Sequence, residues 1–355
     1  MAKSKKITPL PRAHEAVYAA FMIFLCLAFI ELSLRIIKFN YSTTPESMEY
    51  VDWVKGIGDE CFAPFVGKVV STFHKDKDVF WFPDANGPLT NSFGFRGREF
   101  QKEKTPGVTR IICLGDSVTQ NGFPAYPEAL EGMLKATAAG KKYEVINAGV
   151  GSYSSFQGLK LLETKLLNLK PDIITVFFGW NDHWLAWSHT DSELAGYWKL
   201  AAERKFLEKF KIYEFLTKHI VKLKMKKRKF ARFRVPLGDY EKNLVKFISV
   251  ARENNTKILF ITAPTSITPE SRMIRNLVQN THLFPREDLI NRVHSAYNSV
   301  VRESSLKNGI PLLDMELLIE KSAEPKKYFS DDIHFTPAGV EFTARKLMEK
   351  IVKEF

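Results

Sequence analysis

The sequence predicts an α/β fold in which a parallel sheet of five strands lies between helices. Short apolar runs rich in Ile, Val, Leu and Phe alternate with helix-like stretches in the order βαβα. The runs are apolar at successive positions, which is typical of parallel strands buried on both faces. A length of 355 residues with 45% hydrophobic residues is sufficient for one large core.

The elements of this fold can be placed in chain order. The expected strands are Arg110–Leu114, Tyr143–Ile146, Asp172–Phe178, Lys257–Thr262 and Ile310–Leu313. The expected helices are Pro127–Ala136, Phe156–Leu169, Tyr240–Glu253, Arg286–Ser304 and Pro337–Phe355. The last helix has Thr336 as its N-cap and proline at its first position, where a missing N–H costs nothing.

Two segments do not follow this alternation. Residues 41–105 carry Gly, Pro, Trp and Phe with no clear period, and we expect an irregular extension that packs on the core. Residues 185–238 form an insertion between the third and fourth strands, where apolar residues recur every three or four positions and predict a basic amphipathic helix. The predicted organisation is a tail and apolar helix at 1–40, the extension, and an α/β domain at 106–355.

Residues 17–37 are long and apolar enough to span a bilayer. Glu31 and Arg35 lie four residues apart on one helix face, so they can pair and lower the cost of burying either charge. A secretory signal peptide and an amphipathic surface helix are alternatives, but no small-residue cleavage site follows the run. More basic residues precede the span than follow it, which favours an inside N-terminus and an extracytoplasmic α/β domain.

The net charge of +12 is concentrated in one segment. Residues 204–234 contain 13 Lys or Arg against two Glu, a balance of +11. The segment can bind anionic lipid headgroups or an acidic polysaccharide, or be a solvated helix face. A membrane-facing role is the strongest of these, since each basic residue near an anionic surface contributes about 1 kcal/mol. We expect no nucleic acid, because no reading module accompanies the charge.

We expect neither a disulfide framework nor a metal or cofactor site. Cys26 lies in the apolar span and Cys113 in an expected buried strand, which leaves Cys61 without an obvious partner. His183 and His189 lack acidic or cysteine partners at ligand spacing. The glycine-rich stretch after the second strand is not followed by a dinucleotide-binding fingerprint.

Residues that fit nucleophilic catalysis by serine follow the expected strands. Gly115-Asp116-Ser117 closes the first strand, which places the serine hydroxyl at the carboxyl edge of the sheet. A serine nucleophile needs a base, and the base needs a carboxylate that holds its tautomer. Asp331 and His334 can supply both from one turn, with Asp332 as a rival carboxylate. The alternative is that these residues are ordinary turn and helix-start residues.

Two further loops follow strands at the same edge of the sheet. Asn181 follows the third strand and offers a side-chain amide, and the loop Asn147–Ser152 follows the second strand and offers backbone N–H groups. Such donors stabilise the oxyanion of an acyl-transfer transition state, and each typically contributes about 3 to 4 kcal/mol. Three loops that converge on one edge favour the catalytic interpretation.

The chain resembles the SGNH or GDSL hydrolases of the membrane-anchored bacterial type. The resemblance covers residues 75–355, with a lead-in at Thr90–Gly97. It rests on four blocks in the family's order, Gly115-Asp116-Ser117, Asn147–Ser152, Gly179-x-Asn181-Asp182 and Asp331-x-x-His334. It implies a flavodoxin-like three-layer sandwich with a five-stranded parallel sheet. It also implies Ser117 as nucleophile, His334 as base and Asp331 as the carboxylate that orients the base.

The same resemblance implies an oxyanion hole made by the Ser117 backbone N–H, a second-block N–H and the Asn181 side chain. The second-block donor of the family is usually glycine. Alignment through Asn147 places Ser152 there, with Gly151 one residue earlier. A backbone N–H needs no particular side chain, so both residues are candidate donors.

These observations predict a single-pass, membrane-anchored serine esterase. Its expected substrate is an O-acyl ester on an envelope carbohydrate or lipid, cleaved through an acyl-serine. An O-acyltransferase beside a polytopic acyl-donating partner is the nearest alternative, because a sugar hydroxyl can resolve the same acyl-enzyme. A non-catalytic membrane scaffold that binds an anionic partner through the basic helix is a third hypothesis.

Overall fold

The computed structural model of the chain contains two units. One comprises Met1–Pro45 with Lys199–Lys229, and the other comprises Glu46–Trp198 with Phe230–Phe355. The structure describes residues 12–40, 73–137, 141–186, 190–196, 207–226, 232–268, 271 and 287–355. Much of the predicted extension, parts of the predicted insertion, Cys61 and His189 lie outside the described residues.

The larger unit is built on a five-stranded sheet of order β4-β3-β5-β8-β9, in which all neighbouring strands are parallel. The strands are β3 (Val108–Gly115), β4 (Lys142–Gly149), β5 (Ile173–Phe177), β8 (Lys257–Ile261) and β9 (Leu312–Leu313). The predicted fold class is therefore confirmed, with the flavodoxin-like order. The chain reverses its direction of growth across the sheet beside β3, and such switch points are where open α/β sheets bind ligands.

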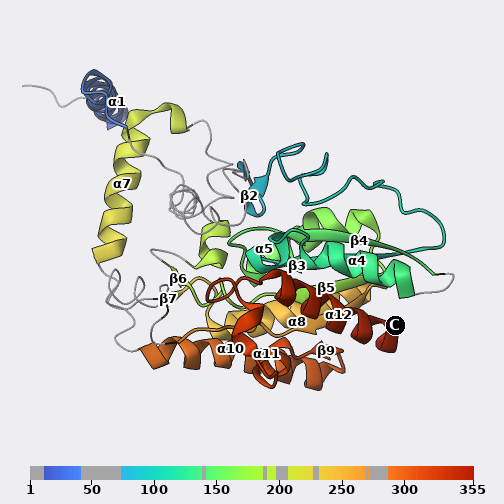
Figure 1. The fold of residues 1–355 in the computed structure, drawn as a ribbon. Helices are drawn as coiled ribbons and strands as arrows, with labels where there is room; N and C mark the ends of the chain where they lie inside the picture. The colour runs from blue at the N-terminus through green and yellow to red at the C-terminus, as the bar shows by residue number, and fades with distance from the viewer. Residues whose placement is uncertain are drawn as a thin grey trace, which may run out of the picture. The chain divides into compact units, whose positions relative to one another are not determined.

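Helices cover both faces of this sheet (Figure 1). Successive residues of β3 alternate between the faces, with Ile112 and Leu114 in one core cluster and Ile111 and Cys113 in the other. The first face is covered by α5 (Ser155–Leu161), α8 (Leu237–Glu253) and α10 (Glu287–Asn308). The second face is covered by α4 (Tyr126–Thr137), α11 (Met315–Glu320) and α12 (Pro337–Glu354).

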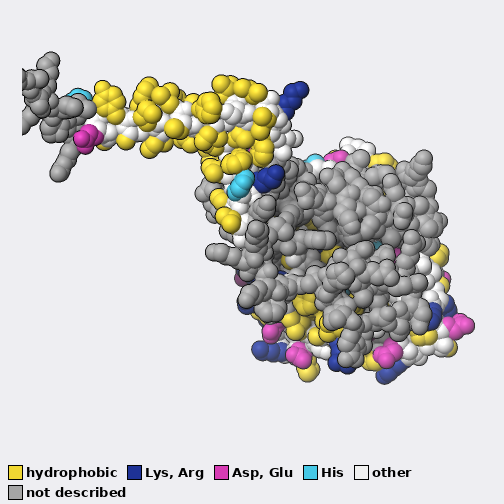
Figure 2. Space-filling model, turned by 90° about the vertical axis from the view of Figure 1, so that its left-hand side faces the viewer, with side chains coloured by type: hydrophobic (Ala, Val, Ile, Leu, Met, Phe, Trp, Pro, Cys, Tyr) yellow, Lys and Arg dark blue, Asp and Glu magenta, His cyan; other side chains and the backbone are white. Residues whose placement is uncertain are grey.

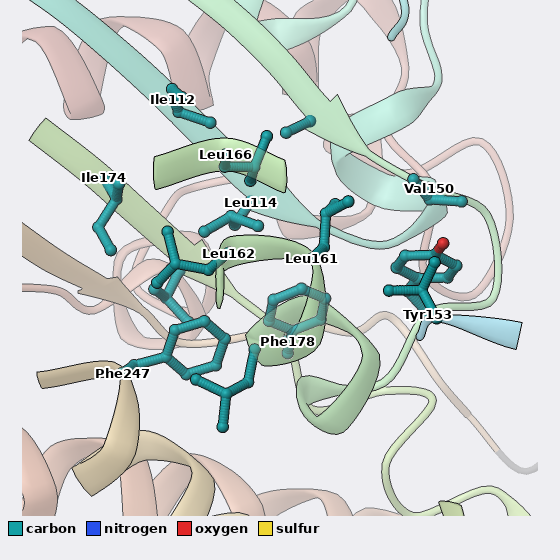
Figure 3. Packing of buried hydrophobic residues seen from close by; sticks show 14 of the residues in the cluster. Ile112, Leu114, Val150, Tyr153, Leu161, Leu162, Leu166, Ile174, Phe178 and Phe247 are labelled. Atoms are coloured by element: carbon teal, nitrogen blue, oxygen red, sulfur yellow. The ribbon is translucent and has the colours of Figure 1, made fainter. Parts of the chain in front are cut away.

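Packing on the first face is dense around the central strands. Figure 3 shows Ile112, Leu114 and Ile174 of the sheet beside Leu162 and Phe247 of the covering helices. Each of these side chains is at least 98% buried. Burial of a side chain of this size contributes about 1.5 to 3 kcal/mol, so these contacts hold the strand ends in fixed register.

One predicted helix differs from the observed element, and one helical turn is additional to the prediction. The expected helix Phe156–Leu169 continues beyond α5 only as a π turn at Leu162–Leu166 and a 3-10 turn at Leu167–Leu169. After Ser117 the chain forms a single helical turn, α3 (Ser117–Gln120), before α4 begins. Gly122 has a φ of +121°, a left-handed conformation that no helix continues through.

The described part of the N-terminal extension forms a hairpin, β1 (Phe73–Asp76) with β2 (Phe80–Pro83). Trp81 of β2 is 3% exposed and packs edge to face on Tyr153, whose hydroxyl donates to the Trp81 carbonyl. Tyr153 directly follows the Asn147–Ser152 loop. The hairpin therefore supports that loop from outside the sheet.

The described helices of the smaller unit are α1 (Arg12–Ile36) and α7 (Lys211–Lys226), with a short 3-10 turn at Leu207–Lys209. The segment His14–Ile36 is long and apolar enough to cross a membrane. Only 6% of its most apolar 18-residue stretch is buried against the rest of the chain. Figure 2 shows the apolar side chains that surround α1. The predicted pair forms within it, with 2.6 Å between Arg35 Nη2 and Glu31 Oε1. Length and composition fit both a membrane anchor and a signal sequence.

Candidate active site

Ser117 lies directly after β3, at the first position of α3 and 9% exposed. Asp116 is the N-cap residue of this turn, and its Oδ1 accepts the Val118 N–H at 2.8 Å. A Cβ at Gly115 would lie 2.0 Å from Thr119 Oγ1, so only glycine allows the turn to fold back this closely. The strand and the turn together present the serine hydroxyl at the carboxyl edge of the sheet.

His334 connects the serine to a carboxylate. Its Nε2 lies 2.9 Å from Ser117 Oγ, and its Nδ1 lies 2.7 Å from Asp331 Oδ2. An ionised carboxylate can only accept, so Nδ1 carries the proton and Nε2 of the neutral ring accepts from the serine hydroxyl. The three sequence-predicted residues therefore lie within hydrogen-bonding distance as Ser117–His334–Asp331.

The loop before α12 fixes the carboxylate. Asp331 Oδ1 accepts the Ile333 N–H at 2.8 Å and the His334 N–H at 2.7 Å, which leaves Oδ2 for the imidazole. Ser266 holds the backbone of the same loop, because its N–H donates to the carbonyl of the rival Asp332 at 2.9 Å and its hydroxyl donates to the Asp331 carbonyl at 2.9 Å. The predicted N-cap contact is present directly after the loop, where Thr336 Oγ1 accepts the Gly339 N–H at 3.2 Å.

The electrostatics of this pair favour a protonated imidazole beside an ionised carboxylate. Burial by itself lowers the pKa of His334, but the hydrogen bond and charge of Asp331, together with the charge of Asp116, raise that pKa above its ordinary value of 6.5. Burial raises the pKa of Asp331, but the hydrogen bond and charge of His334 outweigh it and lower that pKa to about 2. An imidazolium at His334 is therefore stabilised by the carboxylates beside it.

Asn181 follows β5 at the same edge. Gly179 has a φ of +140° and turns the chain, and the Asn181 amide, in a residue 7% exposed, donates from Nδ2 to Asp116 Oδ2 at 2.9 Å. Burial raises the pKa of Asp116 to about 6, against the Val118 N–H and the His334 charge that lower it. The contact holds the Asn181 amide beside the residue that directly precedes Ser117.

The Asn147–Ser152 loop packs on α3. The Asn147 side chain donates to the Thr119 carbonyl at 3.0 Å, and the Gly151 N–H donates to Gln120 Oε1 at 2.9 Å. Ser152 adopts a φ of +65°, the left-handed conformation that favours glycine. Of the two candidate oxyanion donors, Gly151 thus already uses its N–H, and Ser152 has the backbone conformation that glycine takes easily. This favours Ser152 as the donor.

Several residues that support the site are not evident from the sequence. Asp116 belongs to the first block, but its contact with Asn181 spans 65 residues. Arg234 falls within the segment counted as basic surface, yet it is 8% exposed and pairs with Asp191, with 2.9 Å between Nη2 and Oδ2.

His183 is buried, with its Nε2 2.9 Å from Nδ1 of His294. Within the described residues, no group of three His, Cys, Asp or Glu side chains is placed to hold a metal ion.

Comparisons with known proteins point to one family. The model of the GDSL-like Lipase/Acylhydrolase family matches residues 113–342. Isoamyl acetate-hydrolyzing esterase 1 homolog of Homo sapiens is 22% identical over 253 residues, which cover 69% of this chain and 82% of the relative. Its counterpart in Mus musculus is 23% identical over 245 residues, 66% of this chain and 77% of the relative. The lipase/acylhydrolase from Enterococcus faecalis superposes with a TM-score of 0.44 at 16% identity, covering 68% of this chain and 94% of that structure.

Proposed function

Since the chain belongs to the GDSL-like lipase/acylhydrolase family of serine ester hydrolases, we propose that it cleaves O-acyl esters through an acyl intermediate on Ser117. The observation that carries this proposal is the continuous hydrogen-bonded series from Ser117 Oγ through His334 to Asp331, with distances of 2.9 and 2.7 Å. Such a series lets the serine lose its proton as it attacks, which a serine alone cannot do at neutral pH.

The proposed reaction has two halves. Ser117 Oγ attacks the ester carbonyl carbon while its proton moves to Nε2 of His334, and the tetrahedral intermediate then releases the alcohol, which takes that proton. Water, deprotonated by the same nitrogen, attacks the acyl-serine and releases the acid. The carbonyl oxygen becomes negative in both halves, and the backbone N–H groups of Ser117 and Ser152 with the amide of Asn181 are the donors proposed to stabilise it.

A short acetate ester is the first substrate to test, because the curated relatives are named for hydrolysis of isoamyl acetate. We expect the purified chain to release acetate from isoamyl acetate and to be labelled at Ser117 by a fluorophosphonate. Peptide mapping by mass spectrometry identifies the labelled serine. Folded protein that shows neither turnover nor label would refute the proposal.

We further propose that α1 anchors the enzyme in a membrane and that its natural ester lies on an envelope carbohydrate or lipid. The apolar length of α1 and the Glu31–Arg35 pair support an uncleaved span. We expect the chain to resist alkaline extraction from membranes and to retain residues 1–40 in its intact mass. A mature chain that begins after the apolar run would instead identify a cleaved signal peptide.

Acyl transfer remains the alternative outcome of the same chemistry, because a sugar hydroxyl can replace water in the second half. Incubating the enzyme with an acetylated ester, with and without oligosaccharide acceptors, separates the two reactions by mass spectrometry. We expect free acid to exceed acylated sugar. Acylated sugar in excess would make the protein a transferase, with the acceptor rather than water resolving Ser117.

We expect kcat/KM to fall as the pH is lowered, with a midpoint above pH 6.5, the ordinary pKa of histidine. His334 must be neutral to accept the serine proton, and Asp331 and Asp116 raise the pKa of His334, so the active form is lost as pH falls through that raised value. Asp116→Asn removes one of these negative charges and moves the midpoint of kcat/KM to lower pH. A midpoint that stays in place or moves upward would contradict this assignment.

Asn181→Ala will lower kcat about 100- to 1000-fold and change KM far less, because an oxyanion donor acts mainly in the transition state. Asn254→Ala is the matched control, since Asn254 lies exposed at the end of α8 and its amide donates to the Val250 carbonyl. Steady-state kinetics on isoamyl acetate measure both constants. An equal loss in the control, or a loss confined to KM, would exclude the proposed role of Asn181.

A further inference from the structure

The C-terminal end of α1 is attached to the start of α7. Arg35 Nη2 donates to the Lys209 carbonyl at 2.7 Å, and Glu31 Oε2 accepts the Ile212 N–H at 2.8 Å. The Glu31 and Arg35 side chains, which also pair with each other, thus bind one backbone group just before α7 and one in its first turn. α7 therefore begins beside the last turns of α1.

α7 runs across the axis of α1. Figure 1 shows α1 nearly end-on and α7 from the side, within the same unit. The rings of Phe39 and Phe215 meet edge to face with 5.8 Å between their centroids, which adds an apolar contact to the polar ones. A helix that crosses a spanning helix at its end runs parallel to the membrane surface, as interfacial helices do.

α7 carries an exposed apolar row among basic residues. Leu216, Ile220 and Leu223 are 51%, 53% and 62% exposed, and spacings of four and three residues place them on one helix face. The sequence of Lys211–Lys226 contains five Lys against one Glu. This combination of an apolar row with an excess of lysine matches helices that lie in the headgroup layer of anionic bilayers.

We propose that α7 is an interfacial helix that lies on an anionic phospholipid surface, in the leaflet where the C-terminal end of α1 emerges. The apolar row enters the boundary between headgroups and acyl chains, and the basic residues pair with lipid phosphates. An acidic polysaccharide would use the charge and leave the apolar row in water, so a bilayer fits the helix better. The proposal rests on the proposed anchorage by α1.

Site-directed fluorescence in nanodiscs tests this placement. In the full chain with Cys26→Ser and Cys61→Ser, an environment-sensitive dye is attached to Leu223→Cys, and quenching by lipids with a spin label near the headgroup is measured. We expect quenching at least about threefold stronger in discs of phosphatidylcholine with phosphatidylglycerol than in phosphatidylcholine alone, since charge draws the helix to the surface. The dye at Lys218→Cys, on the side of α7 that contacts Phe39, is the matched control and should be quenched less.

A dye at Leu27→Cys, inside α1, separates the two proposals. Quenching at Leu27 by deeply labelled lipids without quenching at Leu223 would overturn the interfacial helix and leave the anchor intact. An absence of quenching at Leu27 by these lipids would overturn the proposed membrane anchor itself. Equal quenching at Leu223 in both lipid mixtures would refute the anionic surface. An acidic polysaccharide can also be added to neutral discs. A shift in the emission of the Leu223 dye would then show that α7 binds that polymer instead of the lipid surface.

A second and independent feature lies in the larger unit, where Arg234 holds the oxyanion loop. Arg234 Nη1 donates to the Ser152 carbonyl at 2.8 Å, and Nη2 donates to Gln157 Oε1 at 2.6 Å. The guanidinium also binds both carboxylate oxygens of Asp191, at 3.1 and 2.9 Å. Asp191 Oδ2 in turn accepts from Ser154 Oγ at 2.6 Å. One buried ion pair therefore fixes the loop on both sides of Tyr153.

Ser152 needs such support because it has no intrinsic preference for its conformation. A φ of +65° is strained for serine and persists only where the surroundings impose it. The Arg234 contact is made to the carbonyl of this same residue. We infer that Arg234 is a positioning residue, which keeps the Ser152 N–H directed at the oxyanion. This inference rests on the proposed function.

Arg234→Lys preserves the charge beside Asp191 but removes the planar fork that reaches both Asp191 and Ser152. We expect kcat to fall about tenfold with KM within about twofold, because an oxyanion donor is displaced while the binding surface is kept. Arg232→Lys is the matched control, since Arg232 forms an exposed pair with Glu193 and should leave kcat unchanged. Active sites are counted by fluorophosphonate label, so unfolded protein does not enter kcat.

Ser152→Gly distinguishes positioning from general stability. Glycine adopts the left-handed conformation without support, so in the Arg234→Lys background it should recover at least about threefold in kcat. The rate constant of fluorophosphonate labelling should recover in parallel. An unchanged kcat in Arg234→Lys, or a loss that Ser152→Gly does not recover, would overturn the inference. Absence of label in the parent chain would instead refute the proposed function.

Discussion

Ser117→Ala will abolish ester hydrolysis, with kcat reduced about 10⁴-fold or more. Ser117 Oγ is the atom that His334 Nε2 contacts at 2.9 Å, and no covalent intermediate can form once it is removed. The residual rate is the catalysis that oxyanion donors and substrate binding supply alone. Initial rates on isoamyl acetate and the loss of fluorophosphonate labelling measure the effect.

The variant is expected to fold normally, because alanine removes one polar atom from a turn that Asp116 already caps. Ser249→Ala on α8 is the control, since its hydroxyl donates to the Lys246 carbonyl of the same helix. It should keep both the rate and the label. Wild-type turnover in Ser117→Ala would exclude Ser117 as the nucleophile and would contradict the proposed acyl-serine mechanism.

Asp331→Asn will reduce kcat about 10³- to 10⁴-fold while the fold is kept. An asparagine amide can donate to Nδ1 of His334, which places the ring proton on Nε2 and prevents it from accepting the serine proton. The substitution also removes the charge that raises the pKa of His334, so the acid-side midpoint of the remaining activity moves to lower pH. Steady-state rates as a function of pH test both effects.

Asp332→Asn is the matched comparison, because Asp332 is the other carboxylate of the same loop. We expect a change in kcat of less than about threefold, since the contact with His334 Nδ1 belongs to Asp331. A larger loss of kcat in Asp332→Asn than in Asp331→Asn would show that Asp332, and not Asp331, orients His334. The two variants have equal charge, so the comparison isolates geometry.

The sheet could be predicted from the sequence because its strands are buried on both faces. The run Ile111–Leu114 is apolar at every position, and each of its side chains is fully buried. The last strand is predicted least well, because β9 contains only Leu312–Leu313, whereas the predicted run begins at Ile310. Pro311, directly before β9, still accepts the Phe260 N–H of β8 through its carbonyl at 3.0 Å. The strand order could not be derived from apolar runs alone, because pairing is decided by contacts between segments far apart in the chain.

The oxyanion loop shows where one sequence is insufficient. The motif spacing placed Ser152 at the donor position and left Gly151, one residue earlier, as a second candidate. What separates them is the contact of Gly151 with Gln120, 31 residues away, and that of Ser152 with Arg234, 82 residues away. Counting charge likewise placed Arg234 with the exposed lysines, although its partner Asp191 buries it. Both cases depend on pairings between distant residues that composition and period do not encode.

The distance along the chain between Ser117 and His334 also governs when the enzyme becomes reactive. The two residues are separated by 217 positions, and every strand of the sheet from β4 to β9 is made between them. During synthesis the serine is therefore an ordinary alcohol until the last of these strands has joined the sheet and the loop before α12 has docked. With the proposed roles of Ser117 and His334, we expect covalent labelling of Ser117 to report completed folding of the whole sheet, and partially synthesised chains to be inactive toward esters.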